Sequence, residues 1–160
     1  MPKTTTRKTF TVLRDTQEQR PWHFQVTEFC RGVIEQKLPT GDYTLAGLEG
    51  RFVIERKGSV LEWAKNINEE RFEEELHRLD QMDHPFIFLE FLPSDIMTFP
   101  RSCRLSLEQK KKLRVSGPYL LRRTWEIQTA YRVKVCHVGR YGQENALSLF
   151  KRMAELLPDE

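Results

Sequence analysis

The stretch of sequence that decides the fold reads GDYTLAGLEGRFVIERK, from Gly41 to Lys57. Its two halves, residues 42–46 and 51–57, are rich in β-branched and aromatic side chains. A glycine-bounded tip, residues 47–50, separates them. Two β-rich runs on either side of a short glycine-containing turn predict a β-hairpin.

Acidic side chains meet across this hairpin. When the strands pair symmetrically about the tip, Asp42 lies opposite Glu55 and the two carboxylates share one face of the ladder. At an effective dielectric of 20 and a separation of about 4 Å, their repulsion is on the order of 4 kcal/mol. A divalent cation between them turns repulsion into attraction, and hard oxygen ligands suit Mg²⁺. Spacing alone leaves two alternatives open, this metal site and an exposed face of salt-bridged side chains.

The two residues after Glu55 point in opposite directions. Strand alternation returns Lys57 to the face of the carboxylates, and it directs Arg56 to the other face. A lysine beside a metal-carboxylate pair can orient or help to deprotonate an attacking water, or it can stabilise charge on a phosphate. Arg56 is expected to hold neighbouring groups in place.

Strand-like and helix-like segments alternate along the rest of the chain, which indicates an α/β fold. Further strands are expected at residues 9–14, 32–38, 84–91 and 132–138. Two helices are expected after N-cap residues: residues 60–67 after Ser59, and a helix after Asn68 with the apolar stripe Phe72, Leu76 and Leu79. A third is expected to open with the capping box Ser106–Gln109. Two more are expected from Gly117 to about Ala130 and at residues 145–157.

Length and composition narrow the protein class. The 160 residues suit one domain, and 39% hydrophobic residues are too many for a disordered chain. No apolar run approaches the ~20 residues that span a bilayer, and the N-terminus lacks the apolar stretch of a signal peptide. The three cysteines match no metal or disulfide pattern. Secreted scaffolds, membrane proteins and zinc fingers are disfavoured, which leaves an intracellular globular domain.

The net charge of +3 conceals an uneven distribution. Between Arg101 and Lys134 ten basic residues face only Glu108 and Glu126, so this segment carries +8 and the rest of the chain −5. Such an asymmetry suggests a polyanionic partner that also tolerates an acidic centre elsewhere. A solvated, lysine-rich helix face would produce the same pattern.

Motifs around the hairpin resemble the nuclease domain of the XPF (xeroderma pigmentosum group F) family of structure-specific DNA endonucleases. The hallmark of that family is Gly-Asp, a spacer, Glu-Arg-Lys, three residues and Asp, preceded upstream by Asp-x-Arg-Glu. The matching residues are Asp15-Thr16-Gln17-Glu18, Leu38-Pro39-Thr40-Gly41-Asp42, Glu55-Arg56-Lys57, the run RFEEEL from Arg71 to Leu76, and the strand PFIFLE that ends at Glu90.

The resemblance implies a restriction-endonuclease-like fold of the PD-(D/E)XK type, an α/β fold with a mixed central sheet flanked by helices. It assigns the metal to Asp42, Glu55 and the main-chain carbonyl of Arg56, with Lys57 as the catalytic lysine. Two upstream acids, Asp15 and Glu18, would support the same cleft. Arg71 would face the site or the phosphate.

Two positions depart from the family pattern. Gln17 replaces the arginine of Asp-x-Arg-Glu, which removes one cation from the rim of the cleft. Leu61 stands where the final Asp is expected, and Glu62 follows it. A one-residue insertion near Gly58 would let Glu62 serve in the site; a helix-surface glutamate is the alternative.

The resulting expectation is a Mg²⁺-dependent DNA endonuclease, with Mn²⁺ as a substitute, that cuts flap, fork or junction DNA in repair, recombination or phage DNA metabolism. Residues 1–160 are expected to form a single domain without a helix-hairpin-helix module, with residues 1–8 as a flexible basic arm. The expected compartment is the cytoplasm of a bacterium or of a phage-infected host. The residues expected to grip DNA are Lys110, Lys111, Lys112, Arg114, Arg122 and Arg123.

Three other functions stay open: a non-catalytic DNA-binding paralogue, an exonuclease of the same fold, and a scaffold domain. The last helix, residues 145–157, is apolar on more than one stripe, so it predicts either a homodimer or a larger monomer core. Trp125 is assigned to the core because Leu121 lies one turn before it on an apolar side.

Overall fold

The computed structural model describes residues 8–157. The expected basic arm, residues 1–8, lies outside the described residues apart from Lys8. The assignment of residues 1–160 to one domain without a helix-hairpin-helix module stays a prediction. None of the helices within residues 8–157 is long and apolar enough to cross a membrane.

A mixed sheet of six strands, in the order β2-β1-β3-β4-β5-β6, forms the centre of the described fold. β3 pairs antiparallel with both β1 and β4, whereas the β1–β2, β4–β5 and β5–β6 pairs are parallel. The strands are β1 (Phe10–Arg14), β2 (Cys30–Glu35), β3 (Tyr43–Leu45), β4 (Phe52–Lys57), β5 (His84–Leu89) and β6 (Lys134–His137). The predicted α/β fold with a mixed sheet is confirmed.

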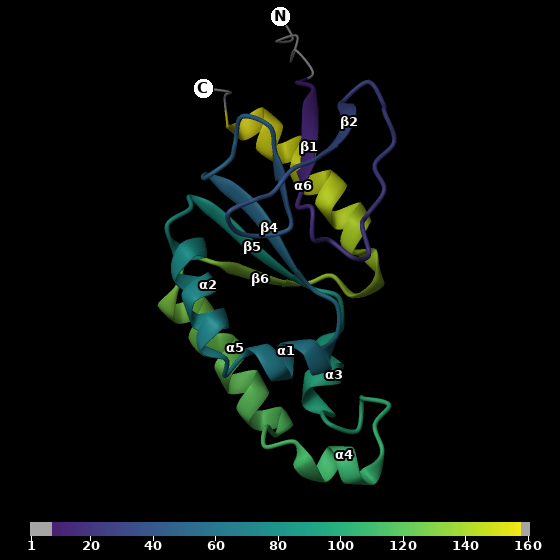
Figure 1. Cartoon of the computed structure of the whole chain (residues 1–160), viewed down its shortest axis with the longest axis vertical. Coiled ribbons are helices and arrows are strands. Elements are labelled where there is room, and N and C mark those ends of the chain that lie inside the picture. Colours follow the sequence, from purple (N-terminus) through teal and green to yellow (C-terminus); the bar gives the residue numbers. More distant parts are fainter. Residues whose placement is uncertain (1–7, 158–160) are drawn as a thin grey trace, which may run out of the picture.

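Helices cover both faces of the sheet (Figure 1). One face packs against α6, and the other against α1, α2 and α5, with α3 beside the start of α5 and α4 beyond it. The helices are α1 (Val60–Asn66), α2 (Glu70–Asp80), α3 (Pro93–Met97), α4 (Leu107–Lys112), α5 (Gly117–Ala130) and α6 (Gly142–Leu156), with a short 3₁₀ turn, η1 (Gly139–Tyr141), before α6.

Two hydrophobic cores follow from strand alternation, because successive side chains of a strand point to opposite faces. On β4, Phe52 and Ile54 face the α6 side, and Val53 faces the α1, α2 and α5 side. Trp63 of α1 is fully buried in the second core, and its Nε1 donates to Thr124 Oγ1 at 3.0 Å. This hydrogen bond ties α1, which follows the hairpin directly, to α5.

The predicted hairpin has the predicted register, with Tyr43 paired to Ile54. The next residue pair along this ladder is Asp42 and Glu55. Gly41 adopts a φ of +79°, and a Cβ at this position would lie 2.0 Å from Val53 Cγ2. Only glycine fits there, because any other side chain would clash with β4 and strain the backbone.

Two predicted helix N-caps are confirmed. Ser59 Oγ accepts from Glu62 N at 3.1 Å, and Ser106 forms the capping box with Gln109 that opens α4. The prediction of Asn68 as an N-cap is wrong, because α2 begins after Glu69. The side chain of Asn68 is engaged elsewhere, since its Oδ1 accepts from the Tyr119 hydroxyl at 2.7 Å.

Two further predictions need correction. The second strand begins at Cys30, two residues before the predicted start, and its ladder with β1 contains a bulge at Gly32, where φ is +120°. Trp125 is 61% exposed and is not a core residue. The buried stripe of α5 instead runs through Leu120, Thr124 and Ile127. The polar Thr124 hid this stripe from the hydrophobic pattern.

Candidate functional site

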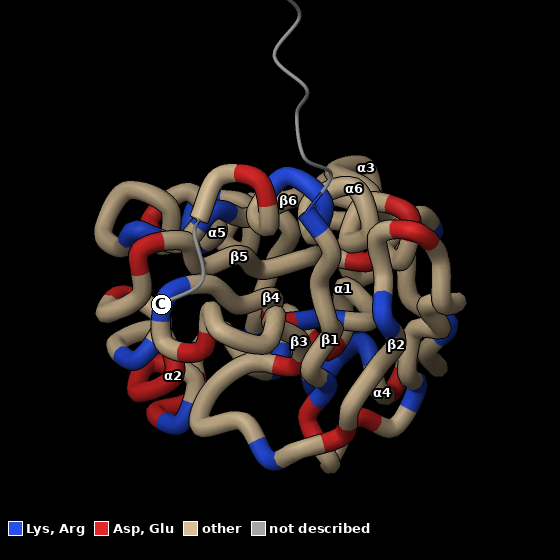
Figure 2. Tube along the Cα trace, turned by 90° about the horizontal axis from the view of Figure 1, so that it is seen from above, with Lys and Arg blue, Asp and Glu red and all other residues tan. Residues whose placement is uncertain are grey.

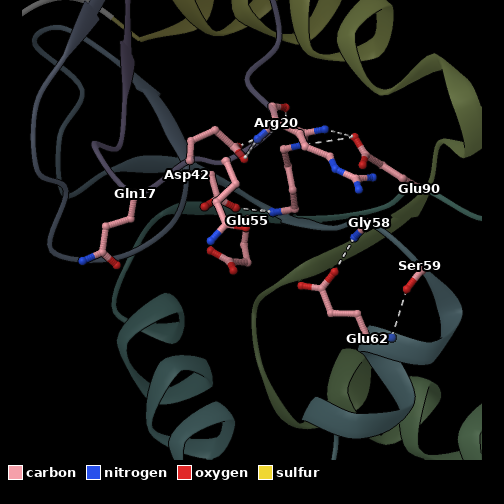
Figure 3. Close-up of a pocket in the computed structure, with 11 residues that line it drawn as sticks. Gln17, Arg20, Asp42, Glu55, Gly58, Ser59, Glu62 and Glu90 are labelled. Carbon is pink, nitrogen blue, oxygen red and sulfur yellow. Dashed lines mark hydrogen bonds and ion pairs between the residues drawn. The ribbon is translucent and has the colours of Figure 1, made fainter.

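A cavity of about 570 Å³ lies at the end of β4 (Figure 3). It is bordered by the loop after β1, the start of β3 and the N-terminal end of α1. Its lining is almost entirely polar and charged, and consists of Gln17, Glu18, Gln19, Arg20, Asp42, Glu55, Arg56, Gly58, Ser59, Glu62 and Glu90.

The hairpin brings Asp42 and Glu55 together at this cavity, where they lie side by side in Figure 3. The backbone of β4 fixes Asp42, because Arg56 N donates to Asp42 Oδ2 at 2.7 Å and Asp42 N donates to Ile54 O at 2.9 Å. Burial raises the pKa of Asp42 to about 7, although the Arg56 N–H opposes this rise. Burial also raises the pKa of Glu55 well above its ordinary value, and the charges of Asp42 and Glu75 add to the rise.

Lys57 lies on the same face as Glu55, as strand alternation predicts. Its Nζ is 3.4 Å from Glu55 Oε1 and 3.9 Å from Glu75 Oε2. Burial alone would lower the pKa of Lys57, but the carboxylates of Glu55, Glu75 and Glu62 together raise it. The ammonium is therefore protonated at neutral pH and acts as a fixed positive charge beside the two acids.

The side chain of Arg56 points to the other face, as predicted, and holds two acids there. Its Nη1 is 3.1 Å from Glu18 Oε2, and its Nη2 is 2.7 Å from Glu90 Oε1. The guanidinium also lies over the ring of Trp22, 4.2 Å from the centroid. Trp22 Nε1 donates to the same Glu90 oxygen at 3.2 Å. This network fixes the main chain of Arg56, whose N–H binds Asp42.

The other predicted site residues lie at different distances from the cavity. Glu18 and Glu62 line it, and Glu62 Oε2 accepts from Gly58 N at 2.8 Å (Figure 3). Asp15 does not line the cavity, because its two oxygens accept from Leu38 N at 2.8 Å and from Gln17 N at 3.2 Å. It shapes the loop that carries Glu18.

Arg71 is not brought to the cavity. Its guanidinium, 83% exposed, lies 3.3 Å from Glu69 on the outside of α2. The expectation that Arg71 faces the site therefore has no support in this arrangement of side chains. The reason is its place on α2, where the neighbouring Phe72 takes the buried position.

The predicted DNA-gripping residues divide into two groups. The first group takes part in no ion pair found among the described residues, and consists of Lys110, Lys111 and Lys112 of α4 and Arg114 after it. Arg122 and Arg123 on α5 both pair with Glu126, at 3.0 and 2.8 Å. Figure 2 shows acidic and basic positions close together near β3 and β4, and both signs along α2.

Sequence reasoning missed three residues of this region: Trp22, Glu75 and the role of Glu90. Glu75 belongs to a run of glutamates in which only the spacing relative to Phe72 and Leu79 distinguishes an inward position from an outward one. Glu90 follows the buried strand β5 directly, and a charged residue at the end of a buried strand was the signal available for it.

The ERCC4 domain model matches residues 14–140. The chain belongs to the ERCC4 domain family. It is an XPF-type nuclease domain with a restriction-endonuclease-like fold, as the resemblance implied. No curated protein gives a significant match.

Two solved structures share the fold of this ERCC4 domain. XPF from Aeropyrum pernix is 22% identical with a TM-score of 0.61, and the match covers 91% of this chain and 60% of that one. XPF from Aeropyrum pernix in complex with DNA gives the same identity, TM-score and coverage of this chain, and 64% of its own length is matched. The chain thus spans less than two thirds of these two proteins.

The acids of this ERCC4 domain fit a divalent cation. Within residues 8–157 no three His, Cys, Asp or Glu side chains are grouped as a metal site, so the donors would be two carboxylates, a main-chain carbonyl and water. Asp42 and Glu55 lie side by side and partly buried, and burial raises the pKa of both, so their ionised forms need a further positive charge nearby. Hard oxygen donors of this kind suit Mg²⁺ and Mn²⁺.

Proposed function

We propose that this domain is a Mg²⁺-dependent endonuclease that hydrolyses phosphodiester bonds in branched DNA, such as flaps, forks or junctions. The observation that carries the proposal is the pair of partly buried acids, Asp42 and Glu55, that line a polar cavity of about 570 Å³, with the buried Lys57 3.4 Å from Glu55. Membership of the ERCC4 domain family supports the same reaction class.

Asp42, Glu55 and the main-chain carbonyl of Arg56 would hold the cation. When bound, Mg²⁺ or Mn²⁺ supplies an activated water and neutralises charge on the phosphate. Both acids must be ionised to bind it, so metal binding at neutral pH would displace the protons that burial favours.

The side chains of this domain supply position and charge. Lys57, protonated because its pKa is raised, would orient the attacking water and stabilise the negative charge that develops on the phosphate. Arg56 would keep its own backbone in place through Glu18 and Glu90. Glu62, 2.8 Å from Gly58 N, would set the shape of the cavity on the α1 side.

DNA would be gripped by the predicted basic residues, Lys110, Lys111, Lys112, Arg114, Arg122 and Arg123. The first four are the stronger candidates, because Glu126 already neutralises part of the charge on α5. A role in repair, recombination or phage DNA metabolism, and a place in the cytoplasm of a bacterium or a phage-infected host, complete the proposal.

A homodimer is also part of the proposal. α6 buries Ala146, Phe150 and Met153 against the sheet but leaves Leu156 45% exposed. Light scattering at micromolar protein would test it, and a single species at the chain mass of 19.0 kDa would refute it.

The test of the nuclease activity is cleavage of a labelled DNA panel: duplex, single strand, 3′ flap, fork, four-way junction and closed circle. Reactions contain Mg²⁺, Mn²⁺ or EDTA, and compare the wild type with Glu55→Gln and with Glu74→Gln, an exposed glutamate on α2. Metal-dependent cutting lost only in Glu55→Gln would support the proposal. Cleavage of every substrate except the closed circle would indicate an exonuclease. Binding of DNA without cleavage would indicate a DNA-binding paralogue. Neither binding nor cleavage would indicate a scaffold domain.

A further inference from the structure

The Lys57 side chain contacts residues of α2 as well as Glu55 on its own strand, β4. Its ammonium is within 3.4 Å of Glu55 Oε1, within 3.9 Å of Glu75 Oε2 and 5.0 Å from the ring centroid of Phe72. The residue is only 5% exposed. A lysine side chain has four rotatable bonds, so these three contacts are what select one orientation among many.

Glu75 reaches this place from a different element. It lies on α2, three residues after Phe72 and four before Leu79, both of which are buried against the sheet. Its side chain is 16% exposed, whereas Glu73 and Glu74 on the same helix face solvent. A glutamate turned inward beside two buried apolar residues needs a partner, and Lys57 and Glu55 provide it.

Glu75 does not belong to the cavity itself. The residues that line the cavity include Glu55 but neither Glu75 nor Lys57. Glu75 therefore acts on the cavity through Lys57 and Glu55, the two side chains that it contacts.

Resting on the proposed nuclease function, we propose that Glu75 is a positioning residue that sets the orientation of the Lys57 ammonium. Without Glu75, Glu55 would be the one carboxylate within 4 Å of the ammonium among the described residues, so Lys57 would close onto it and occupy the oxygen that a cation needs. The Glu75 carboxylate shares the ammonium, as the two distances of 3.4 and 3.9 Å show. Lys57 then stays next to the reaction centre, and Glu55 keeps an oxygen free.

The test compares Glu75→Leu and Glu75→Ala, which remove the acceptor, with Glu75→Gln, which keeps one, and with Glu74→Gln as the matched control. Steady-state cleavage of the best DNA substrate gives kcat and KM, and titration calorimetry gives the Mg²⁺ affinity. We expect Glu75→Leu and Glu75→Ala to lower kcat by about 10- to 100-fold, the loss typical of misplaced supporting groups, and to weaken Mg²⁺ binding because Lys57 then competes for the Glu55 oxygen, with KM for DNA within about twofold. Glu75→Gln should recover most of kcat, and Glu74→Gln should match the wild type.

A second readout does not depend on activity. A crystal structure of Glu75→Leu or Glu75→Ala should show Lys57 Nζ shifted toward Glu55, so this part of the test stands even if the wild type cuts no DNA and the nuclease proposal fails. The inference is overturned by an unmoved Nζ or by an unchanged kcat in a cutting enzyme; weaker Mg²⁺ binding with an unmoved Nζ would make Glu75 a ligand instead. Failure of both variants to fold would also overturn it, because Glu75 would then be a structural residue.

Discussion

Replacing Asp42 with Asn should stabilise the metal-free protein at neutral pH while it destroys the site. Burial raises the pKa of Asp42 from 3.8 to about 7. The unfolded chain therefore loses this proton near pH 4, whereas the folded protein keeps it until about pH 7. The contribution of Asp42 to the free energy of unfolding is highest below about pH 4, falls as the pH rises from about 4 to about 7, and is lowest above about pH 7.

The size of the effect follows from the shift. About three pKa units at 1.36 kcal/mol each give a cost on the order of 4 kcal/mol above pH 7. Asparagine has the same shape and still offers an oxygen to the Arg56 N–H, but its buried amide group recovers only part of that cost. We expect Asp42→Asn to raise the free energy of unfolding by about 2 kcal/mol at pH 8 and to lower it by about 2 kcal/mol at pH 4, because asparagine does not titrate and the wild type alone changes by about 4 kcal/mol between these pH values.

The assay is urea unfolding followed by tryptophan fluorescence in EDTA, from pH 4 to pH 8, for the wild type, Asp42→Asn and the exposed control Glu74→Gln. The difference between the wild type and Asp42→Asn isolates the group from all other titrations. Parallel curves over the whole range, or a variant less stable than the wild type at pH 8, would refute the reasoning. Added Mg²⁺ should stabilise the wild type, by about 2.7 kcal/mol at 100 times its dissociation constant, and leave the variant unchanged.

Three further predictions concern the supports of the site. Gly41→Ala should lower the free energy of unfolding by about 3 kcal/mol or more, because its Cβ would clash with the side chain of Val53 on β4. Gly50→Ala, at a similar φ but with open space around it, should lower the free energy of unfolding by about 1 kcal/mol. Equal losses in chemical denaturation would contradict this prediction. Thr124→Val should cost about 1–3 kcal/mol and lower Tm, because it leaves the buried Trp63 Nε1 without an acceptor; an unchanged Tm would contradict it. Replacing Lys110–Lys112 by Gln should flatten the salt dependence of DNA binding by about one unit of slope for each phosphate that these lysines neutralise, and an unchanged slope would exclude them from the DNA interface.

The hairpin was predictable in detail because every step was local. Gly47 and Gly50 fixed the tip, the tip fixed the register, and the register placed Asp42 beside Glu55 and Lys57. Strand period 2 then decided which side chains share a face. No interaction between distant parts of the chain entered that inference.

Helix orientation was less predictable, because it depends on which residues the rest of the fold covers. Trp125 was expected inside on hydrophobicity, yet Thr124 holds the buried position because Trp63 offers it a hydrogen bond across 61 residues of sequence. Arg71 was expected to face the site and Glu75, four residues later on the same helix, was not singled out, yet the packing of Phe72 turned Glu75 inward and left Arg71 outside. Such choices require the tertiary structure.

The position of the site follows from the change between antiparallel and parallel pairing on the two sides of β4. β4 runs antiparallel to β3 on one side and parallel to β5 on the other. Asp42, just before β3, therefore lies beside Glu55 and Lys57 at the C-terminal end of β4. Glu90 follows the C-terminal end of β5 at the same end of the sheet. If β3 ran parallel to β4, Asp42 would lie at the other end of the strands, about 15 Å away at about 3.3 Å per residue. The mixed sheet, more than any single residue, assembles acids that lie far apart in the chain.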